Sequence, residues 1–383
     1  MLDMTRTREI FDASSDFTVG IEEEFALVDP GSRDLIARFE DLETAAAADD
    51  VLRDAVAGEL ISSEIEIRSK PGRDFADALD SQRENRRRLF ALAASQGIEL
   101  GSTGTHPWSP WQEQRIIDTE HYRRLNDDLG YVAWRNNTFS LQVHVGIAGA
   151  DRAIAVCDRM RHVLPELLAV SANSPFLDGR DSGLASVRSQ IFTRSFPRCG
   201  IPDPFGSFQE YARYVDLLVE MHSIVEFTQL WWSIRPHHRY GTVEVRICDA
   251  QSSAAESDAL AGLMVACVAQ AAVDHDEGVP FVPAPGMLIE ENTWRAIRYG
   301  TEGKLIDLGE RREFPAAALS DRLLAWTAPA RAELGIACEL AEQSGTIRQR
   351  RALAEGSLES AYGAEVDRTQ TTFASNEEVV VDG

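Results

Sequence analysis

Four short segments of the chain alternate apolar and polar residues with the period of a β-strand. They are FTVGIEEEF (17–25), SSEIEIRS (62–69), LQVHVGI (141–147) and GTVEVRICD (241–249). In each segment Val, Ile, Leu or Phe residues recur at alternate positions, with Glu23 as an interruption in the first. The pattern therefore predicts four strands that cover a hydrophobic core with one face.

The opposite face of these strands has an unusual composition. A solvent-facing strand is usually rich in Thr, Lys, Gln and Ser. Here the polar positions carry mostly carboxylate, imidazole and guanidinium groups. They are Glu22, Glu24, Glu64, Glu66, Arg68, Gln142, His144, Glu244 and Arg246. Either these side chains point into water, or they gather in one site. Glu23 points the other way, and either pairs with a buried base or lies at the surface.

Longer segments carry the 3.6-residue periodicity of amphipathic helices. We expect helices over 74–96, 151–172, 208–229, 256–273 and 320–352. Strands that are isolated between helices and loops favour an α+β fold, with helices packed on one face of a largely antiparallel sheet. We predict one domain over 15–362 with a curved sheet of about six strands, followed by an acidic, flexible tail over 363–383.

Composition narrows the class of protein. The 383 residues include 62 acidic and 38 basic ones, which gives a formal net charge of -24. Such a charge argues against nucleic acid or an anionic membrane surface as a partner. The apolar run at 259–273 is too short for a membrane span and predicts a buried helix. Five scattered cysteines without a Cys-x-x-Cys pair, and an N-terminus without an apolar leader segment, favour a reducing cytoplasm.

Carboxylates that crowd one face of a sheet repel one another unless cations bind between them. Two glutamates spaced Glu-x-Glu on a strand lie about 6.5 to 7 Å apart, which suits two adjacent ions. Hard divalent cations prefer oxygen ligands, and Mg²⁺ commonly bridges carboxylates to phosphates. An imidazole ligand makes Mn²⁺ a second candidate. We therefore predict a site for two ions held by Glu22, Glu24, Glu64, Glu66, His144 and Glu244.

These residues lie in segments that resemble a known family, the carboxylate-amine ligases grouped with glutamate–cysteine ligase type 2. The matching segments are GIEEEFALVDP, GSTGTHPW, LQVHVGI, SANSPFLDGRDSGLASVRSQIF, IRPHHRYGTVEVRICDAQ, ENTWRAIRYGTEG and GTIRQR, between about residues 19 and 351. A more distant resemblance is to the catalytic fold of glutamine synthetase, carried by Glu22, Glu24, His144, Arg235, Glu244 and Arg246.

The resemblance implies ATP-dependent formation of an amide bond. The γ-carboxylate of glutamate would be activated as an acyl phosphate and then attacked by an amine, nominally cysteine, to give γ-glutamylcysteine. It also implies a homodimer. Relatives place a cysteine shortly after the second glutamate strand, whereas this chain reads EIRSKPGRDF there, so the acceptor amine stays open.

Arginine suits phosphate and carboxylate because its donors form a planar fork. We expect Arg235 and Arg246 to hold phosphate or the acyl phosphate, with Arg235 also a substrate contact, and Arg188 to hold a substrate carboxylate. The alternative for Arg188 is a salt bridge that stabilises its loop. His237 and His238 fit a surface turn after Pro236 better than a site.

Two other classes of function remain open from sequence. A hydrolase could use the same metals to cleave a γ-glutamyl or related amide, and it would turn over without ATP. A non-catalytic sensor of an amino acid or nucleotide would be stabilised by its ligand and would produce no ADP. The number of carboxylates argues against a pure sensor.

Overall fold

The computed structural model describes residues 3–375 of the chain. The core of the fold is a seven-stranded sheet with the order β10-β11-β5-β1-β3-β2, in which β4 pairs with the end of β1. Every pairing in this sheet is antiparallel. The prediction of an α+β fold with an antiparallel sheet is therefore confirmed, with seven strands where about six were expected. The strands are β1 (Val19–Val28), β2 (Val56–Ala57), β3 (Glu64–Arg68), β4 (Glu99–Gly101), β5 (Ser140–Gly146), β10 (Ile234–His237) and β11 (Thr242–Asp249).

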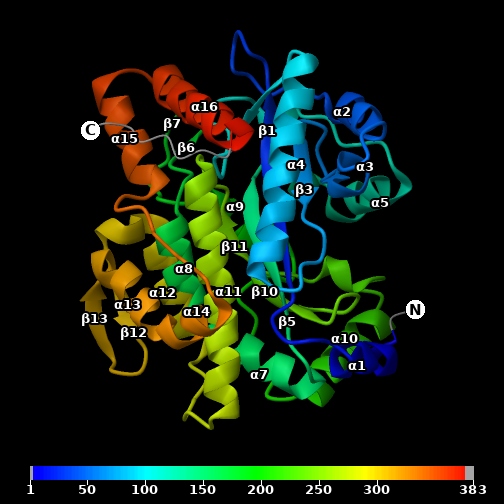
Figure 1. Cartoon of the computed structure of the whole chain (residues 1–383), viewed down its shortest axis with the longest axis vertical. Coiled ribbons are helices and arrows are strands. Elements are labelled where there is room, and N and C mark those ends of the chain that lie inside the picture. The colour runs from blue at the N-terminus through cyan, green and yellow to red at the C-terminus, as the bar shows by residue number, and fades with distance from the viewer. Residues whose placement is uncertain (1–2, 376–383) are drawn as a thin grey trace.

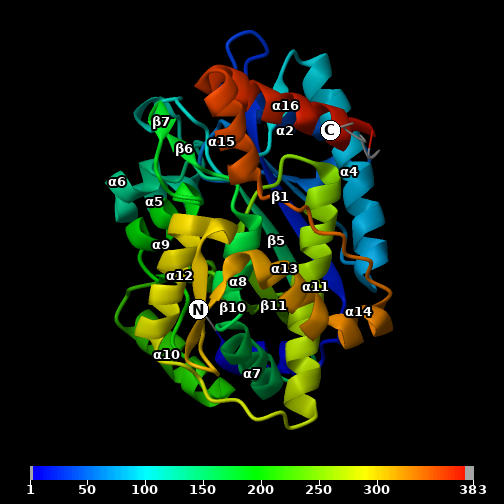
Figure 2. The same ribbon diagram turned by 90° about the vertical axis from the view of Figure 1, so that its left-hand side faces the viewer.

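Helices cover the apolar face of the sheet. Figure 1 shows α4 and α11 crossing in front of the strands, and Figure 2 shows them on one side of the sheet with α5, α6 and α9 on the other. Ile21, Val143 and Val245 of the central strands belong to the largest buried cluster, which these covering helices complete. The helices that pack against the sheet include α4 (Phe75–Ser95), α7 (Ala150–Met160), α8 (Leu164–Ser171) and α11 (Ala254–Asp276), with α9 (Val187–Ser195) on the other side.

The remaining helices surround this centre (Figures 1 and 2). They are α1 (Met4–Asp12), α2 (Phe39–Ala46), α3 (Leu52–Ala55), α5 (Glu120–Leu129), α6 (Tyr131–Trp134), α10 (Phe208–Glu220), α12 (Gly286–Tyr299), α13 (Leu319–Trp326), α14 (Ala328–Leu334), α15 (Gly345–Glu355) and α16 (Leu358–Ser375). Short pairs of strands complete the described part of the chain. They are β6 (Phe176–Leu177) with β7 (Arg180–Asp181), β8 (Cys199–Gly200) with β9 (Trp231–Trp232), and β12 (Lys304–Asp307) with β13 (Arg312–Pro315). The 3₁₀ turns are η1 (Trp111–Glu113), η2 (Phe227–Gln229), η3 (Gly300–Glu302) and η4 (Ala316–Ala318).

Two predicted helices match closely, and three are wrong in extent. The segments 74–96 and 256–273 correspond to α4 and α11. The segment 151–172 breaks into α7 and α8 because Pro165 cannot sit inside a continuous helix. The segment 208–229 is helical only to Glu220, and His222 then adopts a positive φ.

The predicted helix over 320–352 is divided into α13, α14 and α15. Pro329 lies in the first turn of α14, and Gly335 ends that helix in the left-handed conformation. Both residues are typical helix boundaries. Periodicity alone therefore overestimated the length of this helix.

Helix α11 is the one described helix that is long and apolar enough to cross a membrane, by length and composition only. Most of that apolar window, 83%, is buried inside the protein. The prediction of a buried helix at 259–273 is confirmed.

The boundary predicted at residue 362 is wrong, because α16 continues through it to Ser375. Phe373 is fully buried and meets Phe25 of β1 edge-on, with ring centroids 5.3 Å apart. It also stacks on Phe90 of α4 at 5.6 Å. This aromatic packing fixes the C-terminal helix against the sheet, so 363–375 are not a tail. Residues 376–383 lie outside the described part of the chain.

Candidate active site

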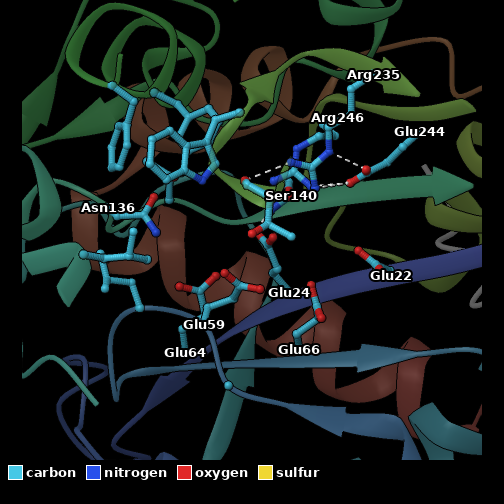
Figure 3. Close-up of a pocket in the computed structure, with 18 of the residues that line it drawn as sticks. Glu22, Glu24, Glu59, Glu64, Glu66, Asn136, Ser140, Arg235, Glu244 and Arg246 are labelled. Atoms are coloured by element: carbon cyan, nitrogen blue, oxygen red, sulfur yellow. Dashed lines mark hydrogen bonds and ion pairs between the residues drawn. The ribbon is translucent and has the colours of Figure 1, made fainter. Parts of the chain in front are cut away.

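The polar face of the sheet forms the floor of a cavity of about 420 Å³. Figure 3 shows its carboxylates and arginines converging from several strands. The period of the strands explains this arrangement, because alternate residues of neighbouring strands point to the same side. All nine predicted site residues line the cavity: Glu22, Glu24, Glu64, Glu66, His144, Arg188, Arg235, Glu244 and Arg246.

One group of potential metal ligands consists of Glu22, His144 and Glu244, whose ligand atoms lie within 4.8 Å of one another. Strand register brings them together, since His144 pairs with Gly20 on β1 and with Glu244 on β11. The Nε2 atom of His144 is 3.2 Å from Glu22 Oε1 and 3.9 Å from Glu244 Oε1. Thr242 Oγ1 lies 3.0 Å from His144 Nδ1, and this contact orients the ring so that Nε2 faces the carboxylates.

A second group consists of Glu24, Glu59 and Glu66, with the same close spacing of ligand atoms. Glu24 and Glu66 are direct partners across β1 and β3. Glu64 lies beside them, and its Oε2 atom is buried with no hydrogen-bond partner within residues 3–375. An unpartnered buried carboxylate oxygen is costly, and a cation would remove that cost. The two groups fit the predicted pair of ions.

Glu59 is a site residue that the sequence analysis missed. It lies in the turn after β2, outside the alternating segments, and yet it lines the cavity in contact with the second group. Its only signal in the sequence was an acidic residue five positions before Glu64. Strand alternation cannot assign a turn residue to a face, so the fold had to reveal it.

The two groups differ in electrostatic character. In the first group burial opposes ionisation of Glu22, but the adjacent His144 lowers the pKa of this carboxyl to about 2. Burial is likewise outweighed at Glu244, where Arg235, Arg246 and His144 hold the pKa well below its usual range. For His144, burial is outweighed by the carboxylates of Glu22 and Glu244, and its pKa is raised. This group is charged and internally paired.

In the second group burial and mutual repulsion favour protonation. Burial, with Glu24 close by, raises the pKa of Glu59 to about 7. Burial and neighbouring carboxylates raise the pKa of Glu64 and Glu66 well above the usual value. Burial also raises the pKa of Glu24. Arg68 pairs with Glu66 at 2.5 Å, and a divalent cation would supply the further positive charge that four crowded carboxyl groups call for. Its all-oxygen ligand set suits Mg²⁺, and the imidazole of the first group suits Mn²⁺.

Arg235 and Arg246 both bind Glu244. Arg235 donates from Nε to Glu244 Oε2 at 2.6 Å and from Nη2 to Oε1 at 3.1 Å, and its Nη1 donates to the carbonyls of Thr228 and Leu230. Most of its donors are thus taken by the protein. Arg246 donates from Nη1 to Glu244 and to Gln142, while its Nε has no partner among the described residues. Arg246 is therefore the better placed of the two to meet a phosphate.

Gln142 and Ser140 of β5 hold Glu24 in place. Gln142 Nε2 donates to Glu24 Oε1 at 2.7 Å, and the backbone N–H of Ser140 donates to Oε2 at 2.5 Å. Since Gln142 also accepts from Arg246, it connects the two groups of carboxylates.

Arg188 is buried, and it donates to backbone carbonyls of β11 rather than standing free in the cavity. It also lies 3.6 Å from Asp249. The alternative of a stabilising salt bridge is thus realised. Its predicted role as a ligand of a substrate carboxylate stays a prediction.

The structure also places His237, His238 and Glu23, whose positions the sequence left open or assigned to the surface. The surface turn predicted for His237 and His238 is wrong: their exposed fractions are 7% and 4%. His237 lines the cavity and stacks on Tyr240, whereas His238 bonds to the hydroxyl of Tyr211 at 2.6 Å. Glu23 is the buried partner of a base, since it receives two hydrogen bonds from Arg86, at 2.7 and 2.8 Å.

The cavity also has an apolar wall. It is built by Leu60, Leu125, Leu129, Phe192, Phe196 and Trp231. This wall gives the site two distinct ends: one that suits cations and phosphate, and one that suits a flat apolar group.

Known proteins resemble this chain in sequence and in fold. The profile of the glutamate-cysteine ligase family 2 matches residues 18–363. A protein of Sorangium cellulosum, provisionally named glutamate–cysteine ligase 2, is 38% identical over 364 residues, with 95% of each chain covered. One of Rubrobacter xylanophilus, provisionally named glutamate–cysteine ligase 2-3, is 39% identical over 359 residues, covering 91% of this chain and 96% of that protein.

Two solved structures share the fold at low sequence identity. The glutamate–cysteine ligase of Francisella tularensis in complex with AMP superposes with a TM-score of 0.64 and 12% identity, covering 94% of this chain and 90% of that chain. A bifunctional glutathione synthetase of Pasteurella multocida gives 0.66 and 12%, covering 96% of this chain and 54% of that chain. At this identity the similarity concerns the fold alone.

Proposed function

The chain belongs to glutamate–cysteine ligase family 2 and is a carboxylate-amine ligase that forms an amide bond, and we propose that it does so with ATP. In the proposed reaction the γ-carboxylate of glutamate is joined to an amine through an acyl phosphate. Cysteine is the nominal acceptor.

One observation carries this proposal. Two groups of carboxylates lie side by side on the floor of a single cavity, with Arg246 at their junction. Phosphoryl transfer to a carboxylate brings several negative oxygens together, and it needs positive charge fixed on both sides of the transferred group. An amide hydrolase can also use two metal ions, so what favours a ligase is the arginine at the junction of the two groups together with the apolar wall of the cavity. The neighbour from Francisella tularensis, solved with AMP, supports adenine nucleotide as the ligand.

The proposed chemistry has two balanced steps. A γ-carboxylate oxygen of glutamate attacks the terminal phosphorus of ATP, so a P–O bond forms while the bond to ADP breaks. The neutral amine nitrogen then attacks the acyl carbon. A C–N bond forms, inorganic phosphate leaves, and the nitrogen loses a proton. Divalent cations, when bound, neutralise phosphate oxygens and keep the reactants in line.

The residues of this chain provide the remaining functions. Glu22, His144 and Glu244 would hold one cation, and Glu24, Glu59 and Glu66 the other, with Glu64 beside them. Arg246 would contact the transferred phosphoryl group, because its guanidinium lies in the cavity with donors to spare. Arg235 would act by fixing Glu244. The apolar wall would receive the adenine ring and keep water from the acyl phosphate, whose hydrolysis would waste ATP.

We also propose that the protein works in a reducing cytoplasm. The described structure has five free cysteines and no disulfide, which agrees with a reducing cytoplasm where ATP and amino acids are available. A homodimer stays a prediction from the family resemblance.

The test is ADP release by the purified chain with Mg²⁺-ATP and glutamate, with and without a panel of amines that includes cysteine. Amine-dependent ADP release, matched by an amide product in mass spectrometry, is the expected result. Cleavage of a γ-glutamyl amide without ATP would show the alternative hydrolase. Ligand-induced stabilisation without ADP under any mixture would show a sensor.

A further inference from the structure

Strand β11 contains a bulge next to the site. Its pairing with β5 is regular from Thr242 to Val245, which lies opposite Val143, and resumes with Cys248 opposite Leu141. Arg246 and Ile247 together lie opposite the single residue Gln142. A bulge of this kind disrupts the ladder, leaves backbone groups without their usual partners and redirects side chains.

The bulge changes which residues of β11 lie on the polar side of the sheet. Regular alternation would put Asp249 on the same face as Val243 and Val245, in the apolar core. The extra residue instead places Cys248 opposite Leu141 and Asp249 opposite Ser140, on the polar side. Cys248 accordingly belongs to the main hydrophobic cluster.

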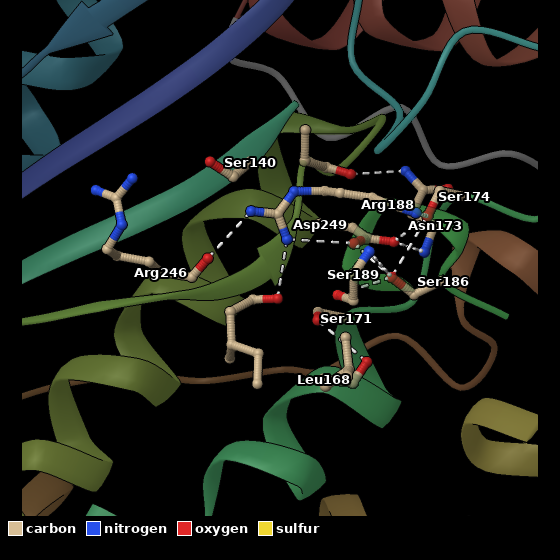
Figure 4. A network of polar contacts seen from close by, with 12 residues as sticks. Ser140, Leu168, Ser171, Asn173, Ser174, Ser186, Arg188, Ser189, Arg246 and Asp249 are labelled. Atoms are coloured by element: carbon tan, nitrogen blue, oxygen red, sulfur yellow. Dashed lines mark hydrogen bonds and ion pairs between the residues drawn. The ribbon is translucent and has the colours of Figure 1, made fainter. Parts of the chain in front are cut away.

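The guanidinium group of Arg188 binds both carbonyls of the bulge, while the backbone N–H of Arg246 donates to the carbonyl of Ser233 at 2.9 Å. Arg188 of α9 donates from Nη2 to the carbonyl of Arg246 at 3.1 Å and from Nη1 to the carbonyl of Ile247 at 3.0 Å (Figure 4). These are the carbonyls of the two bulged residues. The planar fork of arginine holds two adjacent acceptors in a fixed geometry, whereas the donors of an ammonium group rotate freely.

Arg188 is itself fixed by a buried network around Asp249 (Figure 4). Asp249 is fully buried, and its Oδ1 lies 3.6 Å from Arg188 Nη1. The carboxylate accepts hydrogen bonds from Asn173 N at 2.9 Å, Ser174 Oγ at 2.6 Å and Ser186 Oγ at 2.8 Å. Ser174 Oγ in turn accepts from the backbone N–H of Arg188 at 3.2 Å. The network leaves Arg188 little freedom to move towards a ligand.

The bulge matters for the site because Arg246 extends from it into the cavity. Its side chain contacts Glu244 in the first group of carboxylates. It also contacts Gln142, which orients Glu24 in the second group. A displacement of the backbone at Arg246 would therefore disturb both groups together.

We propose that Arg188 is a positioning residue that holds the β11 bulge, and through it aims Arg246 at the transferred phosphoryl group. The role of Arg246 rests on the function proposed above. Arg188 then acts without touching substrate, in place of the carboxylate-binding role predicted from sequence.

The first experiment measures the bulge without reference to activity. Hydrogen–deuterium exchange is followed over residues 243–250 in wild type and in Arg188→Gln. We expect exchange in this segment to rise at least about tenfold while the exchange of α4 and α11 is unchanged. Arg194→Gln is the matched control, because Arg194 lies on the same helix and forms an exposed pair with Glu290 at 3.4 Å. Unchanged exchange at 243–250 in Arg188→Gln would overturn the proposal.

The second experiment is a double-mutant cycle on turnover with Arg188→Gln, Arg246→Gln and the double variant. We expect kcat of Arg188→Gln to fall about 10²-fold. The double variant should lie within about twofold of Arg246→Gln alone, since the two residues act through one group. Arg188→Lys should not rescue kcat.

A raised KM for glutamate with unchanged kcat would show instead that Arg188 binds substrate. Multiplicative losses in the double variant would also contradict the proposal. If the wild type releases no ADP with any mixture, the proposed function fails. The exchange measurement then decides the role of Arg188 by itself.

Discussion

Arg235 and Glu244 lie opposite each other on β10 and β11 and form a buried pair with two hydrogen bonds, of 2.6 and 3.1 Å. Each side chain is nearly inaccessible to solvent. Arg235, which was expected to bind phosphate, thus uses two of its guanidinium nitrogens to bind the carboxylate of Glu244. The pair fixes Glu244 beside His144 before any ligand arrives.

Replacing Arg235 tests this assignment. Arg235→Lys keeps the charge but loses the fork, so we expect the free energy of unfolding to fall by about 3 kcal/mol, together with activity. Thermal and urea denaturation measure the change. Arg295→Lys is the control, because Arg295 pairs with Glu291 and Glu313 at the surface and should lose less than about 1 kcal/mol. A stable Arg235→Lys variant with weakened ATP binding would restore the phosphate-binding role.

The two groups of carboxylates predict two cation sites. We expect wild type to bind two Mn²⁺ ions, and Glu22→Gln and Glu59→Gln to bind one each, because the variants remove ligands from different groups. Electron paramagnetic resonance of free Mn²⁺ gives the stoichiometry. Glu333→Gln, at an exposed position, should keep both sites. Two ions retained by Glu59→Gln would remove that residue from the site.

Replacing Glu24 should reduce catalysis with little effect on the stability of the fold. Glu24→Gln should reduce ATP turnover by more than about 10²-fold, because it weakens a cation ligand at the reacting centre. The melting temperature should change by only a few degrees. The amide oxygen can still accept from Ser140 N or Gln142 Nε2, and repulsion from Glu59 and Glu64 is relieved. Undiminished turnover would contradict the proposed cation site.

A buried acid away from the site predicts a pH effect on stability. Burial raises the pKa of Glu166 to about 7, although Arg322 opposes the rise from 3.5 Å. The folded state then binds the proton more tightly than the unfolded state, whose pKa is near 4.5. The stabilisation is complete below that value and is lost as pH rises to about 7.

Glu166→Gln isolates this contribution. The free energy of unfolding of the wild type, relative to that of the variant, should fall by at most about 3 kcal/mol as the pH rises from 4.5 to 7. Melting curves of both proteins across this range measure it, and contributions from the active-site carboxylates cancel in the difference. A constant difference across the range would show that Glu166 titrates normally in the folded protein.

The strand pattern by itself assigned most of the site. Alternation with period two is imposed by the backbone, so it placed Glu22, Glu24, Glu66, His144 and Glu244 on one face without knowledge of strand order. The same periodicity identified α4 and α11, whose sequences contain no interior proline. The periodicity of the residues was therefore sufficient to predict structure within regular strands and helices.

Tertiary structure decided what lies outside those repeats. Glu59 reaches the second group of carboxylates from a turn, and no periodic pattern includes it. The bulge in β11 moved Asp249 from the core face to the polar face, where it anchors Arg188. Residues 363–375, which were predicted to be part of a tail, belong to a helix that is packed on the protein through the buried Phe373. Each depends on contacts between distant segments, whose free energies become available only when the chain has folded around them.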